Sequence, residues 1–108
     1  QFLLLQSTVS LGWQYTCILA HTSNELVKCW GNNAYYQLNT GDTKSRTSPI
    51  TISFPSTVPA NIEAGLYFIC VIDNAGVVMC VGRNEYGQFG NGANNVYEAS
   101  PTVSMTDL

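Results

Sequence analysis

The sequence predicts an all-β fold in which one pattern of short antiparallel strands occurs twice. Three observations support this prediction. The second half of the chain repeats the first half block by block. Runs rich in β-branched and aromatic residues are bounded by turn residues such as Gly, Asn, Asp and Pro. No long segment repeats its apolar residues at the 3.6-residue period of a helix.

Identical residues align the two halves in order. Gly12 and Cys17 match Gly65 and Cys70 at a separation of 53 residues. At a separation of 51, Cys29, Gly31, Asn33, Tyr35, Gln37 and Gly41 match Cys80, Gly82, Asn84, Tyr86, Gln88 and Gly92. Ser48 and Pro49 match Ser100 and Pro101 at 52. We therefore treat residues 1–108 as a single β-repeat unit, with repeat one at about 9–52 and repeat two at about 62–104.

Each copy contains a predicted β-hairpin. The first joins strands at 15–20 and 26–30, and the second joins strands at 68–72 and 77–81. Pairing Asp73 with Val77 leaves a three-residue loop that ends in Gly76, which suits a type I turn followed by a left-handed residue. The same construction leaves residues 22–24 as the first loop, with Asn24 in the left-handed position. Both faces of the strands are apolar, which is typical of sheets that stack on other sheets.

The charge distribution narrows the classes of partner. Only 10% of the residues are charged, 45% are hydrophobic, and the net charge is −3. The cations do not form a patch, which disfavours binding to nucleic acid or to an acidic membrane surface; they are Lys28, Lys44, Arg46 and Arg83. No apolar run approaches the roughly 20 residues of a membrane helix, so we expect no membrane insertion.

The side chains that usually support catalysis are sparse. His21 is the single histidine, on a predicted hairpin tip, and the carboxylates are scattered. The segment 85–92 resembles a phosphate loop only in its glycines, because it lacks the lysine and the following helix. We therefore predict that the protein is not an enzyme and has no catalytic, cofactor-binding or metal site.

The four cysteines occupy equivalent positions in the two copies. The hairpin registers place Cys17 opposite Cys29 and Cys70 opposite Cys80, so the sequence favours one disulfide across each hairpin. Two such disulfides indicate an oxidising compartment and hence a secreted, extracellular protein. Four buried free thiols in a cytosolic protein remain the alternative.

The segments CWGNNAYYQLNTG and CVGRNEYGQFGNG resemble the repeat of the regulator of chromosome condensation family. The resemblance covers about residues 9–104 and implies two antiparallel propeller-type blades. Its signature positions here are Gly12, Gly65, Gly31, Gly82, Asn33, Asn84, Gln37 and Gln88. Tyr36 and Asn39 replace two glycines of the pattern. The version with paired cysteines resembles extracellular members, and the family has no common catalytic residues.

Two blades are incomplete as a monomer, because a propeller closes with about 4–8 blades. Only eleven residues precede Gly12, so we expect the first copy to lack its Ser-Pro strand. The terminal strand at about 100–105 is then expected to complete the blade of a neighbouring chain. This predicts a secreted structural protein that assembles head to tail into a ring or an extracellular fibre. The alternative is a segment of a larger propeller that binds a protein or a glycan.

Two further groups of surface residues are candidates for recognition or modification. Tyr36 and Tyr97 fall in loop contexts and are the aromatic residues that we expect to face a ligand. Ser and Thr near Pro are candidate O-glycan sites, namely Thr47, Ser48, Ser56, Thr57, Ser100 and Thr102.

Overall fold

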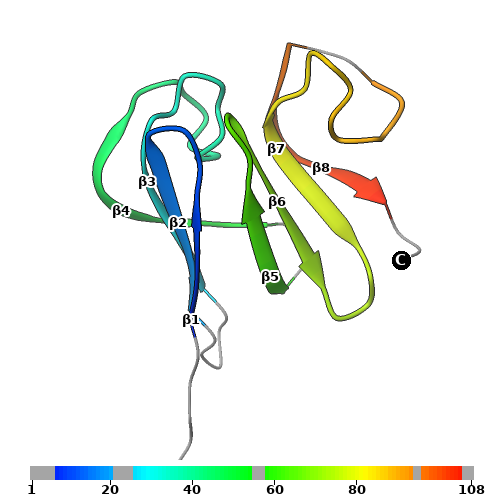
Figure 1. The fold of residues 1–108 in the computed structure, drawn as a ribbon, viewed down its shortest axis with the longest axis horizontal. Coiled ribbons are helices and arrows are strands. Elements are labelled where there is room, and N and C mark those ends of the chain that lie inside the picture. The colour runs from blue at the N-terminus through cyan, green and yellow to red at the C-terminus, as the bar shows by residue number, and fades with distance from the viewer. Residues whose placement is uncertain (1–6, 21–25, 55–57, 94–95, 106–108) are drawn as a thin grey trace, which may run out of the picture.

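The computed structural model describes residues 7–20, 26–54, 58–93 and 96–105 (Figure 1). Regular secondary structure in these residues consists only of strands, which form two four-stranded antiparallel sheets. The sheet of blade one contains β1 (Ser7–Leu11), β2 (Tyr15–Ala20), β3 (Leu26–Gly31) and β4 (Arg46–Ile52) in that order. The sheet of blade two contains β5 (Pro59–Ala64), β6 (Phe68–Asp73), β7 (Val78–Arg83) and β8 (Tyr97–Met105). The predicted all-β class with two antiparallel blades is confirmed.

The fourth strand of each sheet pairs with the third strand of the same chain. In blade one, β4 pairs with β3, and Cys29 lies opposite Ile50. In blade two, β8 pairs with β7 of the same chain, and Cys80 lies opposite Thr102. The strand at about 100–105, which was expected to complete a neighbouring chain's blade, lies in the sheet of its own chain here, and its exchange between chains stays a prediction. After each third strand a long loop returns the chain to the open edge of the same hairpin, so each blade is complete within the chain.

The hairpin turn of blade two follows the residue types at its tip. The backbone N–H of Gly76 donates to the carbonyl oxygen of Asp73 at 3.2 Å, and the N–H of Asp73 donates to Val77 at 3.0 Å. Gly76 has a φ of 85°, the left-handed conformation that glycine adopts without steric cost. The carboxylate of Asp73 accepts from the N–H groups of Ala75 and Val77 at 2.9 Å. The three-residue loop predicted for this hairpin is present, whereas residues 21–25 lie outside the described part of the chain.

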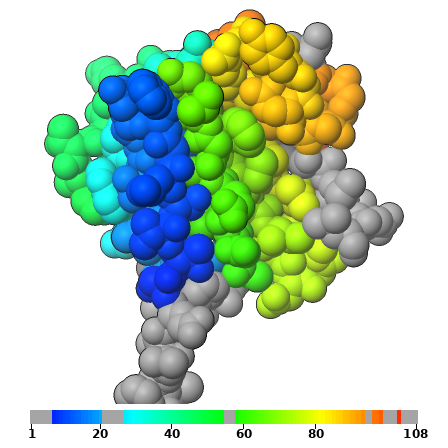
Figure 2. Space-filling view, in the orientation of Figure 1, coloured from blue at the N-terminus to red at the C-terminus, as the bar shows by residue number. Residues whose placement is uncertain are grey.

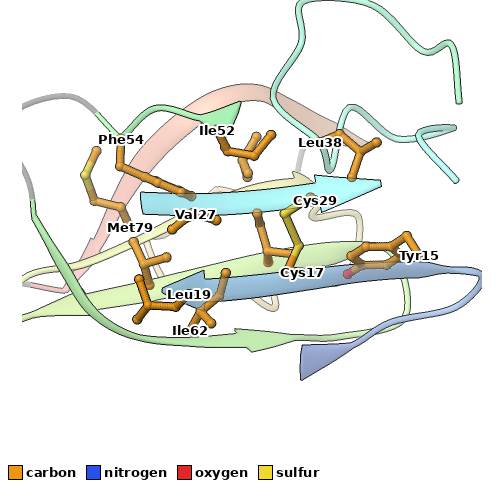
Figure 3. Close-up of a cluster of buried hydrophobic side chains, with 13 residues drawn as sticks. Tyr15, Cys17, Leu19, Val27, Cys29, Leu38, Ile52, Phe54, Ile62 and Met79 are labelled. Carbon is orange, nitrogen blue, oxygen red and sulfur yellow. A yellow bond between two sulfur atoms is a disulfide. The ribbon is translucent and has the colours of Figure 1, made fainter. Parts of the chain in front are cut away.

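The hydrophobic core lies in the seam between the two blades (Figure 3). Alternate residues of β2, namely Tyr15, Cys17 and Leu19, are buried on the face toward blade two. Blade two contributes Ile62, Ile69, Val71, Met79 and Val81 to the same cluster. Each apolar side chain of this size stabilises the fold by about 1.5–3 kcal/mol when fully buried. The seam therefore joins the blades into one packed unit.

Hydrogen bonds between the two blades cross the seam beside the core. The hydroxyl of Tyr15 lies 2.8 Å from the carbonyl oxygen of Gly65 and 2.6 Å from that of Phe68. The backbone N–H of Ala64 donates to Oγ of Ser10 at 2.8 Å. Burial raises the pKa of Tyr15, and the hydrogen bond to the Phe68 carbonyl opposes this shift. These contacts fix the register of β1 and β2 against β5.

Disulfides join Cys17 to Cys29 and Cys70 to Cys80. In each pair the cysteines lie directly opposite each other in the hairpin, and their Cα atoms are 4.1 Å apart. No cysteine of the chain is left free. Each bond links the second and third strands of one blade.

Candidate protein-binding rim

One end of both sheets carries the longest loops that the structure describes. The turns at 12–14 and 65–67 lie at the upper end in Figure 1, together with the loops at 32–45 and 84–93. This follows from the up-and-down strand order, because these segments connect the first strand to the second and the third to the fourth. We call this end the rim. The turn at 74–76 lies at the opposite end.

Buried asparagines of the repeat signature shape the two rim loops. Asn33 is fully buried, and its Oδ1 accepts from the N–H of Leu38 at 2.9 Å. Asn84 is also fully buried, and its Oδ1 accepts from the N–H of Phe89 at 3.0 Å. The equal separation of five residues shows that both loops fold in the same way. The signature asparagines thus have a structural role in this chain.

The signature glutamines make one equivalent contact but differ in burial. Oε1 of Gln37 accepts from the N–H of Tyr35 at 2.8 Å, and Oε1 of Gln88 accepts from the N–H of Tyr86 at 3.0 Å. Gln37 is fully buried, whereas Gln88 is exposed. The loop of blade one therefore lies at the seam, and the equivalent loop of blade two is open.

Two of the signature glycines are required where backbone segments approach closely. Gly31 and Gly82 have φ values of 108° and 119°. A Cβ atom on Gly31 would lie 2.4 Å from the carbonyl oxygen of Gln14, and one on Gly82 would lie 2.5 Å from that of Tyr67. Any other residue would push the rim turn away from the third strand. Tyr36 and Asn39 adopt the left-handed conformation, with φ values of 64° and 54°, in place of the family's glycines.

An ion pair stabilises the rim loop of blade one. Arg46 and Asp42 are joined by hydrogen bonds of 3.1 Å to both carboxylate oxygens. These bonds, followed by the bond from the N–H of Lys44, hold the pKa of Asp42 at about 2. Ala93 occupies the position equivalent to Asp42, so blade two lacks this pair.

A cluster of tyrosines surrounds one arginine at the centre of the rim. The guanidinium carbon of Arg83 lies 5.2 Å from the ring centre of Tyr35, 5.6 Å from that of Tyr67 and 5.5 Å from that of Tyr86. The rings of Tyr35 and Tyr67 are 4.9 Å apart, and Arg83 also forms an ion pair with Glu85. Such cation–π contacts contribute about 0.5–2 kcal/mol each. We call Tyr35, Tyr67, Arg83 and Tyr86 the arginine–tyrosine cluster.

The aromatic residues predicted to face a ligand contact each other. The ring centres of Tyr36 and Tyr97 are 4.6 Å apart, which joins the loop of blade one to the start of β8. The hydrogen bond with Tyr97, followed by its charge, raises the pKa of Tyr36. Tyr97 remains 44% exposed, so part of this pair is still accessible to solvent.

The most exposed aromatic residue of the rim was not singled out from the sequence. Tyr86 is 82% exposed although it belongs to the arginine–tyrosine cluster, and Trp13 and Leu66 are also exposed on the rim turns. The repeat offset of 51 aligns Arg83 with Asn32, so the sequence shows that the two copies differ here. It does not show which rings pack against Arg83. A surface of rigid aromatic rings around one partly screened cation is suited to contact with protein.

The candidate O-glycan residues lie in three separate parts of the chain. Thr47 and Ser48 are exposed on β4. Ser56 and Thr57 lie outside the described residues, and Ser100 and Thr102 lie in β8 with only their backbone described.

Across the described ranges, no three His, Cys, Asp or Glu side chains gather closely enough to hold a metal ion. In the same ranges, no helix is long and apolar enough to cross a membrane.

Family models of the regulator of chromosome condensation (RCC1) repeat match residues 27–72 and 60–88 of this chain. The chain is 35% identical over 92 residues to the human and mouse proteins named probable E3 ubiquitin-protein ligase HERC4. These matches cover 82% of this chain but only 8% of those proteins.

Solved structures show the same fold. Human WBSCR16 matches with a TM-score of 0.78 and 17% identity, over 92% of this chain and 25% of that chain. Prp20p of Saccharomyces cerevisiae matches with a TM-score of 0.70 and 19% identity, over 89% of this chain and 26% of that chain. The chain thus spans about a quarter of these solved chains.

Proposed function

Because this chain belongs to the regulator of chromosome condensation (RCC1) repeat family, we propose that it is a two-blade propeller segment that binds a protein through its rim. The proposal includes no enzymatic activity. The name of the HERC4 relatives denotes a ligase, but the chain spans only 8% of their length.

The known partners of similar proteins support a protein ligand. The structure of Prp20p is described together with its binding to Gsp1p and histones, and another structure shows Kap60 bound to yeast RCC1. All of these partners are proteins. The sequence identity to these structures is below 25%, so the similarity shows a common fold and does not identify the partner of this chain.

The arginine–tyrosine cluster is the observation on which the proposal depends. Three ring centres lie within 5.6 Å of the guanidinium carbon of Arg83, so Tyr86 is positioned by this contact and stays exposed. Tyrosine and arginine are the residue types that most often dominate binding energy in protein interfaces. A preorganised ring loses little conformational entropy when a partner binds. The rim therefore offers an anchor at Tyr86.

Site-specific photo-crosslinking tests this proposal. A photoreactive phenylalanine analogue replaces Tyr86, and the protein is incubated with extract or culture fluid of the producing cells. We expect a small number of discrete heavier adducts. In the same protein, Arg83→Ala should reduce their yield, because the ring of Tyr86 loses its support.

The matched control places the analogue at Ala75, an exposed residue of the turn at the opposite end. It should yield none of the adducts seen at position 86. Identical adducts from both positions would show that the rim has no selective partner.

We also propose that the protein acts in an oxidising, extracellular compartment. The two disulfides support this proposal, because such bonds are rare in reducing compartments. Alkylation of unreduced native protein should modify no cysteine. Modification of all four cysteines without a reductant would refute the extracellular assignment.

Head-to-tail assembly into a ring or fibre is the second candidate function. Because β8 pairs with β7 of its own chain in the structure, this candidate does not depend on strand exchange. The observation that favours assembly is the set of apolar residues exposed on β1, where Val9 and Leu11 are 58% and 70% exposed. Apolar surface of this kind marks interaction sites.

A further inference from the structure

Each blade has one face in the seam and an outer face on the other side. On blade one the outer face carries alternate residues of β1, β2 and β3, namely Val9, Leu11, Ile18 and Lys28. On blade two it carries Asn61, Glu63, Cys70, Ile72 and Val78. These residues of blade two surround an open, mostly apolar hollow of about 210 Å³.

The internal seam indicates what these outer faces would contact. β1 and β5 run side by side in it (Figure 2). Ile62 lies beside Leu19 in the buried cluster (Figure 3). The N–H of Ala64 donates to Ser10. The face of blade two that is buried here corresponds, by the repeat offset, to the outer face of blade one. The buried face of blade one likewise corresponds to the outer face of blade two.

The offset of 53 residues gives the equivalent contacts. Ile62 corresponds to Val9, and Leu19 corresponds to Ile72. If the seam were repeated between two copies, Val9 of one copy would enter the hollow beside Ile72 of the other. Both residues are apolar, as their counterparts in the seam are.

The polar contact is preserved with a different acceptor. Ala64 corresponds to Leu11 and Ser10 corresponds to Glu63. The N–H of Leu11 would therefore face the carboxylate of Glu63, which accepts hydrogen bonds more strongly than a hydroxyl. Glu63 is exposed in the single chain.

The charges of the two outer faces are complementary. Lys28 occupies the position that Met79 has in blade two, at an offset of 51. The outer face of blade one thus carries a cation, and the outer face of blade two carries the anion Glu63. A carboxylate is costly to bury unless donors or an opposite charge accompany it. The outer face of blade one supplies the donor at Leu11, and it carries Lys28 two strands away on β3.

We infer that the outer face of blade two binds the outer face of blade one in a second copy of this chain. The contact centres on Glu63 and Ile72 of one copy and on Leu11 and Val9 of the next. Because the two faces differ, the contact is heterologous and leaves one free face at each end of the pair. This inference rests on the head-to-tail assembly candidate and is independent of rim binding.

Two variants with one disabled face each provide the test. Leu11→Asp places a carboxylate against Glu63 and disables the outer face of blade one. Ile72→Asp places a charge in the hollow and disables the outer face of blade two. By sedimentation velocity, the unmodified chain should form oligomers that grow with concentration, and each variant should associate at least about tenfold more weakly. An equimolar mixture should form a one-to-one dimer that does not grow.

Substitutions at Glu63 separate its chemistry from general apolar association. Glu63→Gln keeps an acceptor and should retain oligomers, whereas Glu63→Lys should abolish them because it replaces the acceptor for the N–H of Leu11 with a cation. Ala75→Lys, on the distal turn, is the charge control and should behave as the unmodified chain. Circular dichroism checks that each variant is folded, and photo-crosslinking at position 86 should be unchanged by all of them. An unmodified chain that stays monomeric, or a mixture that forms no dimer, would overturn the inference.

Discussion

The hydroxyl oxygen of Tyr15 lies 2.8 Å from the carbonyl oxygen of Gly65, so a side chain of blade one is tied to the first turn of blade two. The same hydroxyl is also within 2.6 Å of the Phe68 carbonyl and shares its single proton between the two acceptors. Blade two has Phe68 at the position equivalent to Tyr15. A tyrosine hydroxyl therefore makes these hydrogen bonds only in the seam between the two blades of the chain.

We predict that Tyr15→Phe lowers the free energy of unfolding by about 1–2 kcal/mol, because it removes a largely buried hydrogen bond. Urea denaturation followed by circular dichroism measures this change. Phe68→Tyr is the matched control on the outer face of blade two and should change the stability by less than about 0.5 kcal/mol. Equal effects of the two substitutions would show that the seam is not where Tyr15 acts.

We predict that Asn33→Ala destabilises the protein by about 2–3 kcal/mol, since the buried amide is bonded at both ends. Its Nδ2 donates to Thr40, Asp42 and Lys44 at distances between 2.8 and 3.1 Å. Asn84→Ala should cost about 1–2 kcal/mol, because Nδ2 of Asn84 has a longer bond of 3.3 Å to Ala93. Thermal unfolding of both variants checks the order, and a larger loss for Asn84→Ala would contradict it.

The Asp42–Arg46 ion pair predicts that the effect of an Asp42 substitution on thermal stability depends on pH. The pKa of Asp42 falls from 3.8 to about 2 in the folded state, so its contribution to stability is present above pH 3.8. That contribution is lost as the pH falls through about 2. Asp42→Asn should therefore lower the Tm at pH 7 and have a much smaller effect at pH 2, where about half of the carboxylate is protonated. A Tm difference that is the same at both pH values would exclude the ion pair as its cause.

The disulfides predict a strong dependence on reductant. Cys17 and Cys29 are separated by 12 residues, and closing a loop of this size stabilises a protein by about 3 kcal/mol. A double variant with Cys17→Ser and Cys29→Ser should shift the urea midpoint down accordingly. Further reduction should then affect only the Cys70–Cys80 bond. If reductant leaves the midpoint of the unmodified chain unchanged, the disulfides do not form in solution.

The sequence predicted the hairpins closely because turn chemistry fixes local register. A three-residue loop that ends at Gly76 places Cys70 opposite Cys80, and the structure has this strand pairing. The same residue types specify both turn and register, so no tertiary information is needed. Internal identity also revealed the repeat period.

The phase of the repeat, meaning the residue at which each blade begins, could not be predicted from the sequence. Identity at a fixed separation gives the length of a repeat but not the residue at which a blade begins. Ser48 and Pro49 read equally well as the end of one copy or the start of the next. Only the pairing of β4 with β3 decides between these alternatives.

The rim cluster was likewise hidden, because it is formed by packing between blades. Tyr35 belongs to blade one, while Tyr67 and Arg83 belong to blade two. Their rings and guanidinium meet only when the two sheets stack. A repeat comparison treats these positions within each copy and so does not bring them together.

Each blade is completed by strands of a single chain. Isotope-filtered NOE spectroscopy on a mixture of labelled and unlabelled protein tests this most directly. We predict that backbone contacts between β7 and β8, such as those joining Met79 to Val103 and Cys80 to Thr102, appear only within one chain. Their appearance in the spectrum selected for contacts between chains would contradict the claim and restore strand exchange as the mode of assembly.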